Sequence, residues 1–143
     1  MTVSIILTGK GRDVVTIEPG ASLAEATRLL AQKRIGAALI LGADGRLAGI
    51  ISERDIVRAL AARGAGALNE PVSLSMTRKV ETCSEGEAVS NIMERMTHGK
   101  FRHMPVADQG RVVGIVSIGD IVKHRLGEME RDSAAMRDYI MTA

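Results

Sequence analysis

The sequence predicts an α+β fold made of two similar halves, each in the order strand, helix, strand, strand, helix. The first supporting observation is self-similarity, because the run that begins at Val14 is repeated from Val80. The second is an apolar spacing of three and four residues in the first helical segment of each half, as in amphipathic helices. The third is a turn signal between two apolar runs, Asp44-Gly45 in one half and Gln109-Gly110 in the other.

The first half sets out the expected elements. Pro19-Gly20 ends a short strand, and Ser22 followed by Glu25 has the spacing of a helix capping box. Gly64 closes the last helix. The expected elements are a strand at 14–17, a helix from Leu23, strands at 37–41 and 47–51, and a helix at 55–63.

The second half repeats the first at a nearly constant offset. Thr16 and Thr82 stand 66 residues apart, whereas Gly49 and Gly114 stand 65 apart, so one residue is lost between these pairs. A unit this short buries its apolar face against its copy. We therefore divide the chain into an N-terminal segment with the first repeat (1–66), a connector (67–79), the second repeat (80–126) and a helical tail (127–143).

Composition narrows the possible functions. Of the 143 residues, 45% are hydrophobic and 25% are charged, which is ordinary for a globular protein. One Phe, one Tyr and no Trp leave almost no rings on which bases could stack, and the net charge is only +2, so nucleic acid is an unfavoured partner. Cys83 occupies the position of Ile17 in the first repeat, which favours a buried apolar role over redox chemistry.

The sequence contains neither a membrane-targeting segment nor a recognisable catalytic motif. The apolar run 3–7 is too short to span a membrane and has no basic flank or cleavage site, so we expect a cytoplasmic protein. We find no nucleophile elbow, P-loop, HExxH motif or oriented Cys-His pair, and no metal-ligand spacing. The sequence therefore predicts a protein that is not an enzyme and requires no metal.

A duplicated block, G-I-[IV]-S-x-x-D-I-V, begins at Gly49 and again at Gly114. Ser52 and Ser117 stand where a strand gives way to a helix, and the free amides of a first helical turn suit a phosphate. Asp55 and Asp120 can each accept two hydrogen bonds from a ribose diol. The alternative is that each Ser and Asp pair only caps its helix.

The duplicated block, the T-x-x-P segment at Thr16 and the R-H-M-P-V strand at Arg102 resemble a tandem pair of cystathionine-β-synthase (CBS) domains. The resemblance covers about residues 10 to 126. It implies a pseudo-twofold module of two β-α-β-β-α repeats with two clefts that bind adenine nucleotides such as AMP, ATP, NAD(H) or S-adenosylmethionine. It also implies a stand-alone regulatory protein of the bacterial type that forms homodimers.

The resemblance implies two unequal clefts. Each cleft joins the Ser and Asp of one repeat to the T-x-x-P segment and second strand of the other. The first cleft would comprise Ser117, Asp120, Thr16, Ile35, Gly36 and Ala37. The second would comprise Ser52, Asp55, Thr82, Phe101, Arg102 and His103. Glu85 replaces the proline found at Pro19, which weakens the match at Thr82.

Three basic side chains distinguish the second cleft. Arg102 and His103 have no counterpart in the first repeat and are candidates for phosphate recognition, the alternative being a solvated strand end. Arg54 stands where the second repeat has Gly119, and it can reach a phosphate or pair with a neighbouring carboxylate. Phe101 offers the only ring able to stack on a base.

The tail carries an apolar seam of heptad spacing, from Val122 to Ile140, which favours self-association over packing on its own domain. We therefore expect a homodimeric sensor that binds an adenine nucleotide, AMP foremost with NAD(H) or ATP possible, and signals to an unidentified protein. The alternatives are a scaffold subunit with vestigial clefts and an NAD(H)-responsive redox sensor.

Overall fold

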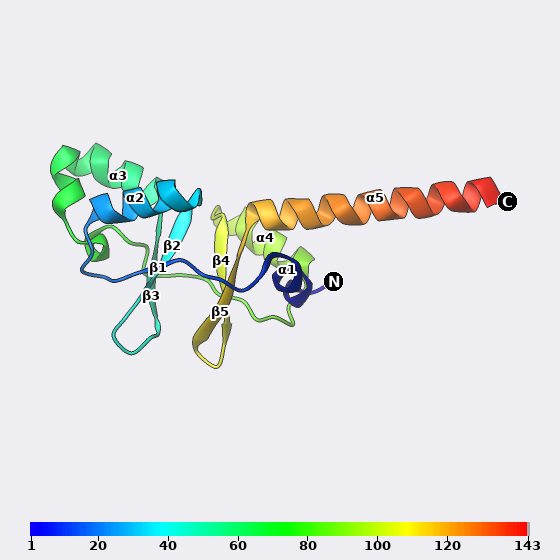
Figure 1. Ribbon diagram of the computed structural model, residues 1–143, viewed down its shortest axis with the longest axis horizontal. Helices are drawn as coiled ribbons and strands as arrows, with labels where there is room; N and C mark the ends of the chain where they lie inside the picture. Colours follow the sequence, from blue (N-terminus) through cyan, green and yellow to red (C-terminus); the bar gives the residue numbers. More distant parts are fainter. Residues whose placement is uncertain (143) are drawn as a thin grey trace.

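The computed structural model describes residues 1–142 and contains two similar repeats side by side, β-α-β-β-α in the first and α-β-β-α in the second, with one long helix leaving the body (Figure 1). The first repeat comprises β1 (Thr16–Ile17), α2 (Leu23–Lys33), β2 (Ala37–Leu41), β3 (Leu47–Ser52) and α3 (Glu53–Arg63). The second comprises α4 (Val89–Gly99), β4 (His103–Asp108), β5 (Arg111–Ser117) and α5 (Ile118–Thr142). Helix α1 (Val3–Lys10) precedes them, and two 3-10 turns, η1 (Gly64–Asn69) and η2 (Val72–Leu74), connect them. The α+β prediction is confirmed.

Each repeat contains its own small sheet. In the first, β1 is parallel to β2, and β2 is antiparallel to β3 with Ala37 opposite Ser52. In the second, β4 and β5 are antiparallel with His103 opposite Ser117. The predicted turns form at Gly45 and at Gln109-Gly110, all three with positive φ. The registers place the two duplicated serines at equivalent strand ends.

The prediction of a first strand in the second repeat is wrong, because only an isolated bridge between Cys83 and Val106 forms there. Proline explains the difference. In the first repeat, the Leu39 amide donates to the Val15 carbonyl. The equivalent position in the second repeat is Pro105, which has no N–H to donate.

The two apolar cores exchange segments along the chain. Val3, Ile6 and Leu7 of α1 lie in the core of the second repeat, with Ile92 and Met104 among their partners. The connector does the same for the first repeat, since Ala67 and Val72 are fully buried in its core. Each repeat is therefore completed by the segment that precedes the other repeat.

Two glycines of the duplicated block permit this exchange. A Cβ at Gly114 would lie 2.8 Å from the Leu7 side chain, and one at Gly49 would lie 2.7 Å from the Met76 sulfur. Both distances are shorter than side chains tolerate, so the glycines admit α1 and the end of the connector. The packing of the exchanged segments accounts for the glycine at the same place in each repeat.

The tail expected at 127–143 continues the last helix of the second repeat without a break as far as Thr142, and Ala143 lies outside the described residues. Helix α5 has 25 residues, of which only Ile121 is fully buried. Cys83 is buried as expected, and burial raises the pKa of its thiol to about 11. No helix among residues 1–142 is both long and apolar enough to cross a membrane.

Candidate functional site between the repeats

The two Ser and Asp pairs cap the helices that start at the centre of the molecule. Ser52 and Asp55 form a complete capping box on α3, in which Asp55 accepts from the Ser52 amide at 2.9 Å. Asp120 accepts from the Ser117 amide at 2.8 Å, and the Asp120 amide donates back to the Ser117 hydroxyl at 3.1 Å. The capping interpretation is therefore correct for both pairs. A carboxylate of this kind can bind a ligand only through an oxygen that the protein's own hydrogen bonds leave free.

Both carboxylate oxygens of Asp55 accept hydrogen bonds from the protein itself. It is 7% exposed, and its second carboxylate oxygen accepts from the Thr77 hydroxyl at 3.0 Å. Its first oxygen also accepts from the Ser52 hydroxyl at 3.0 Å. Both oxygens are thus occupied by the helix cap and the connector.

Asp120 is more available. Its Oδ2 takes the bond from Ser117 and a second from Lys10 Nζ at 2.7 Å, whereas its Oδ1 accepts no bond within residues 1–142. Partial burial acts to raise the pKa of this carboxyl, but the Lys10 and Ser117 hydrogen bonds outweigh burial and hold the pKa below its usual value. Asp120 is therefore ionised at neutral pH with one oxygen open to a ligand.

Lys10 was missed by the sequence analysis. Besides Asp120, its ammonium group binds the Ile115 carbonyl at 2.9 Å. The equivalent carbonyl of the first repeat, that of Ile50, accepts from the Thr77 amide at 2.9 Å. Lys10 and Thr77 thus occupy equivalent places, and the signal that could have revealed them is their position immediately before the two repeats.

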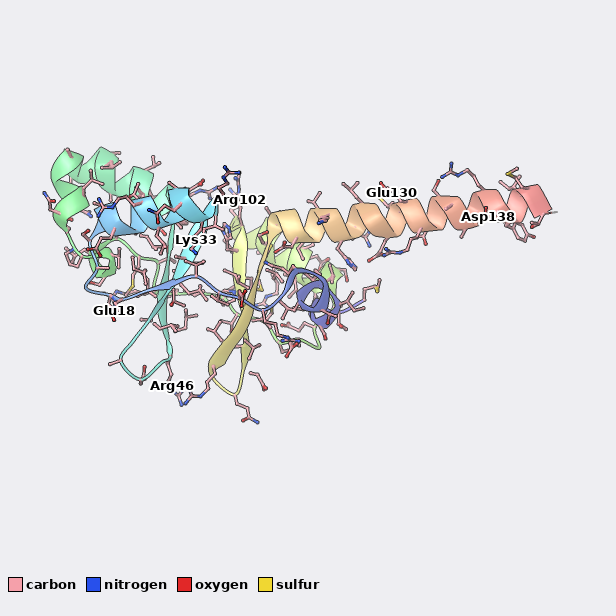
Figure 2. All side chains as sticks on the ribbon, viewed as in Figure 1. Glu18, Lys33, Arg46, Arg102, Glu130 and Asp138 are labelled. Carbon is pink, nitrogen blue, oxygen red and sulfur yellow. The ribbon has the colours of Figure 1, made fainter. Side chains whose placement is uncertain are left out.

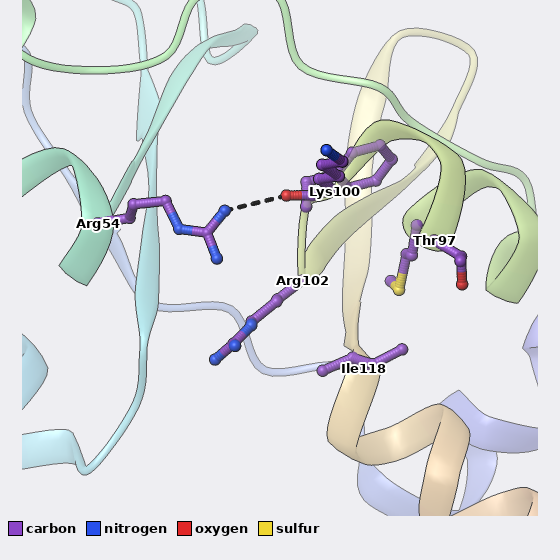
Figure 3. A pocket seen from close by; sticks show the side chains of 7 residues that line it. Arg54, Thr97, Lys100, Arg102 and Ile118 are labelled. Atoms are coloured by element: carbon purple, nitrogen blue, oxygen red, sulfur yellow. Dashed lines mark hydrogen bonds between the residues drawn. The ribbon is translucent and has the colours of Figure 1, made fainter.

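A cavity of about 340 Å³ lies between α3 of the first repeat and, in the second, α4, the segment 100–102 that follows it and the start of α5 (Figure 3). Three of the predicted residues, Arg54, Phe101 and Arg102, line it together. The remaining lining residues are Met96, Thr97, Lys100 and Ile118. Arg54 spans the two repeats, because its guanidinium donates to the Lys100 carbonyl at 3.1 Å.

The cavity is electropositive, and no acidic residue in the described part of the chain lines it. Its charged groups are Arg54, Lys100 and Arg102, and the N-terminal turns of α3 and α5 reach it through Arg54 and Ile118. The amides of the second helical residues, Arg54 and Gly119, take part in no hydrogen bond within the described chain. Free amides at two helix N-termini beside three cations suit a phosphate group.

His103 lies between the residues of the two predicted clefts. Its ring packs on Gly36, where an added Cβ would stand 3.2 Å from Cε1. Burial lowers the pKa of His103 most, Glu53 and Asp120 act to raise it, and Lys10 and Arg102 act to lower it. His103 therefore links the Asp120 group to the cationic cavity next to Arg102.

The other predicted residues lie around this centre. Ala37 is buried on β2, with Ile35 and Gly36 half-buried before it, and Thr16 is exposed on β1. Thr82 is exposed, and its carbonyl accepts from Arg95 at 2.9 Å rather than facing the cavity. Among residues 1–142, no group of three His, Cys, Asp or Glu is arranged to hold a metal ion.

His103 provides a pH prediction. Because burial holds its folded pKa below the unfolded value of about 6.5, the folded state binds a proton less readily, and stability should fall as pH falls below about 7. His103→Gln should make the loss of stability between pH 7.5 and 5.5 smaller than in the unmodified protein. Urea unfolding at both pH values measures this, with His98→Gln, an exposed position on α4, as the control. An unchanged pH dependence in His103→Gln would contradict the prediction.

Comparisons with known proteins agree with this architecture. The model of the family described as "CBS domain" matches residues 11–62 and 72–127. The CBS-domain protein ATU1752 from Agrobacterium tumefaciens is 47% identical, with a TM-score of 0.85 over 87% of this chain and 92% of that one. The CBS protein PAE2072 from Pyrobaculum aerophilum, solved in complex with AMP, is 30% identical, with a TM-score of 0.75 over 84% and 89%.

A third solved structure is the CBS domain pair of protein MJ0100 in complex with 5-methylthioadenosine and S-adenosylmethionine. It is 32% identical, with a TM-score of 0.80 over 90% of this chain and 98% of that one. Curated relatives are longer, and the matched region spans 66%, 39% and 21% of the length of three of them.

Proposed function

The chain belongs to the CBS-domain family, and we propose that its paired repeats form a regulatory module that binds an adenine nucleotide between them without turning it over. The observation that carries the proposal is the cavity at the repeat interface, with three cations, a ring and two helix N-termini. Two similar pairs, PAE2072 and MJ0100, were solved with adenosine-containing ligands, which supports the same ligand class here.

We assign the phosphate to the cavity and the ribose to Asp120. Asp120 lies in the first turn of α5, two positions after Ile118, which lines the cavity, and we infer that one ligand extends from the cavity to Asp120. Phe101 packs over Gly99 and presents its ring toward the cavity, where a base can lie against it. AMP is the simplest ligand with these three parts, and ATP or NAD(H) would extend beyond them.

Regulation follows from where the ligand sits. Arg54 belongs to one repeat, and the rest of the cavity lining belongs to the other. A nucleotide bound here contacts both repeats and stabilises one relative arrangement over others. A partner protein that recognises this arrangement would complete the sensor.

A ligand panel tests the proposal. Thermal unfolding with AMP, ADP, ATP, NAD⁺, NADH and S-adenosylmethionine should show stabilisation by at least one, since a ligand at 100 times its dissociation constant adds about 2.7 kcal/mol. Adenosine and inorganic phosphate alone should stabilise less than AMP. Calorimetry that shows no heat with any of these nucleotides at micromolar sensitivity would favour a scaffold with vestigial clefts.

Matched arginine variants locate the site. Arg102→Ala should weaken AMP binding and leave adenosine binding nearly unchanged, because only AMP carries the phosphate. Arg111→Ala, an exposed position at the start of β5, removes the same charge away from the cavity and is the control. Equal effects of the two variants on AMP would place the phosphate elsewhere.

A further inference from the structure

Helix α5 exposes an apolar seam that no other element within residues 1–142 covers. The seam comprises Val122, Leu126, Met129, Ser133, Met136 and Ile140, spaced alternately by four and three residues. Its five hydrophobic members are 49–65% exposed. Figure 2 shows the part of α5 that carries Glu130 and Asp138 extending into solvent, away from both sheets.

A projecting helix of this kind requires a partner. Tertiary packing of the apolar face supplies most of a helix's stability, and clustered exposed apolar side chains mark interaction sites. The spacing sets the seam in heptad register, with Leu126, Ser133 and Ile140 at a positions and Met129 and Met136 at d positions. This pattern fits a second helix with the same repeat.

The charges beside the seam identify that helix as α5 of a second copy in parallel orientation. In a parallel pair, a g residue faces the e residue five positions further along the partner. Arg125 then faces Glu130 of the second copy, and Asp132 faces Arg137. Both pairings are attractive, and twofold symmetry makes each occur twice.

The antiparallel alternative brings like charges together. In the antiparallel register that pairs the whole seam, with position 126 facing position 136, e faces e and g faces g, which sets Glu130 against Glu130, Asp132 against Asp132 and Lys123 against Arg137. Like charges in facing positions oppose association. When the whole seam is paired, the same residues therefore favour the parallel orientation over the antiparallel one.

The body of the protein leaves room for the parallel pair. Ile118 and Ile121 attach α5 to the second repeat, and at about 100° per residue they lie about 40° and about 100° from the centre of the seam, on the same side of it. A twofold axis along the seam therefore directs the two bodies outward to opposite sides. We propose that the exposed part of α5 forms a parallel, in-register coiled coil with α5 of a second copy, an assembly that does not depend on nucleotide binding.

Cysteine cross-linking of the full chain tests the orientation. In the parallel pair every seam residue meets itself, so Leu126→Cys and Met136→Cys should each give a disulfide-linked dimer on copper-phenanthroline oxidation. The wild-type protein should give little disulfide-linked dimer of its own, because its single cysteine, Cys83, is 5% exposed. Ala135→Cys, on the outer side of the exposed helix, is the matched control and should link far less.

The outcomes separate the alternatives. An antiparallel pair would link only when the two variants are mixed, because position 126 then faces position 136, and that result would overturn the proposal. Absence of a cross-link in either variant and in the mixture would overturn it too, since the seam would not face a second copy. Linking of each variant alone supports it.

Charge exchange provides a second test. Asp132→Arg and Arg137→Asp should each weaken the dimer roughly three- to tenfold in sedimentation experiments, because each places like charges at two contacts. The double variant restores both contacts and should return to within about threefold of wild type. Failure of the double variant to recover would contradict the parallel register.

Discussion

Leu7→Ala should lower the free energy of unfolding by about 2–5 kcal/mol, although Leu7 lies outside the repeat whose core it fills. Leu7 is 1% exposed and packs against Gly114 on β5. The substitution leaves a cavity in the second core and also improves helix propensity, so any loss of stability reports packing alone. Urea unfolding at constant pH measures the effect.

A matched control lies on the same helix. Ile5 is 46% exposed, and Ile5→Ala should cost less than about 1 kcal/mol. Hydrogen exchange should show the loss of protection in Leu7→Ala concentrated in β4, β5 and α4, which share this core. Equal stability of the two variants would show that α1 does not belong to the second core in solution.

The exchange of segments shows where sequence reasoning reached its limit. Apolar periodicity and the Ser22 cap located α2, and the turn residues located both hairpins, because these signals are local. Helix α1 was missed because its run of apolar residues gives no amphipathic pattern and its partners lie more than 70 residues away. The shortened first strand of the second repeat was predictable in principle, since Pro105 was visible.

The candidate site likewise has a part that the sequence predicted and a part that it could not predict. The sequence predicted that Arg54, Phe101 and Arg102 belong together, and they line one cavity. It could not distinguish Asp55 from Asp120, because the two blocks are nearly identical. The difference comes from Thr77 and Lys10, which lie outside the blocks and reach the carboxylates only after the repeats have packed.

The difference between Asp55 and Asp120 predicts which of the two carboxylates binds the ribose. Asp120→Ala should weaken affinity for the best nucleotide about tenfold to a hundredfold, because it removes charged hydrogen bonds worth roughly 1.5–3 kcal/mol. Asp55→Ala should leave affinity nearly unchanged and lower stability by about 1–3 kcal/mol, because it leaves the donors of Ser52 and Thr77 without their acceptor.

Lys10→Met separates the ribose contact from the ion pair. It keeps the Asp120 carboxylate and most of the side-chain stem but removes the ammonium group that binds Oδ2. If the carboxylate itself holds the ribose, Lys10→Met should stay within about threefold of wild-type affinity while Asp120→Ala does not. Calorimetric titration of the three variants and the Asp55→Ala, Asp120→Ala double variant measures affinity and stoichiometry together. Wild-type affinity in the double variant would mean that both aspartates serve only as helix caps, so that the ribose must bind elsewhere.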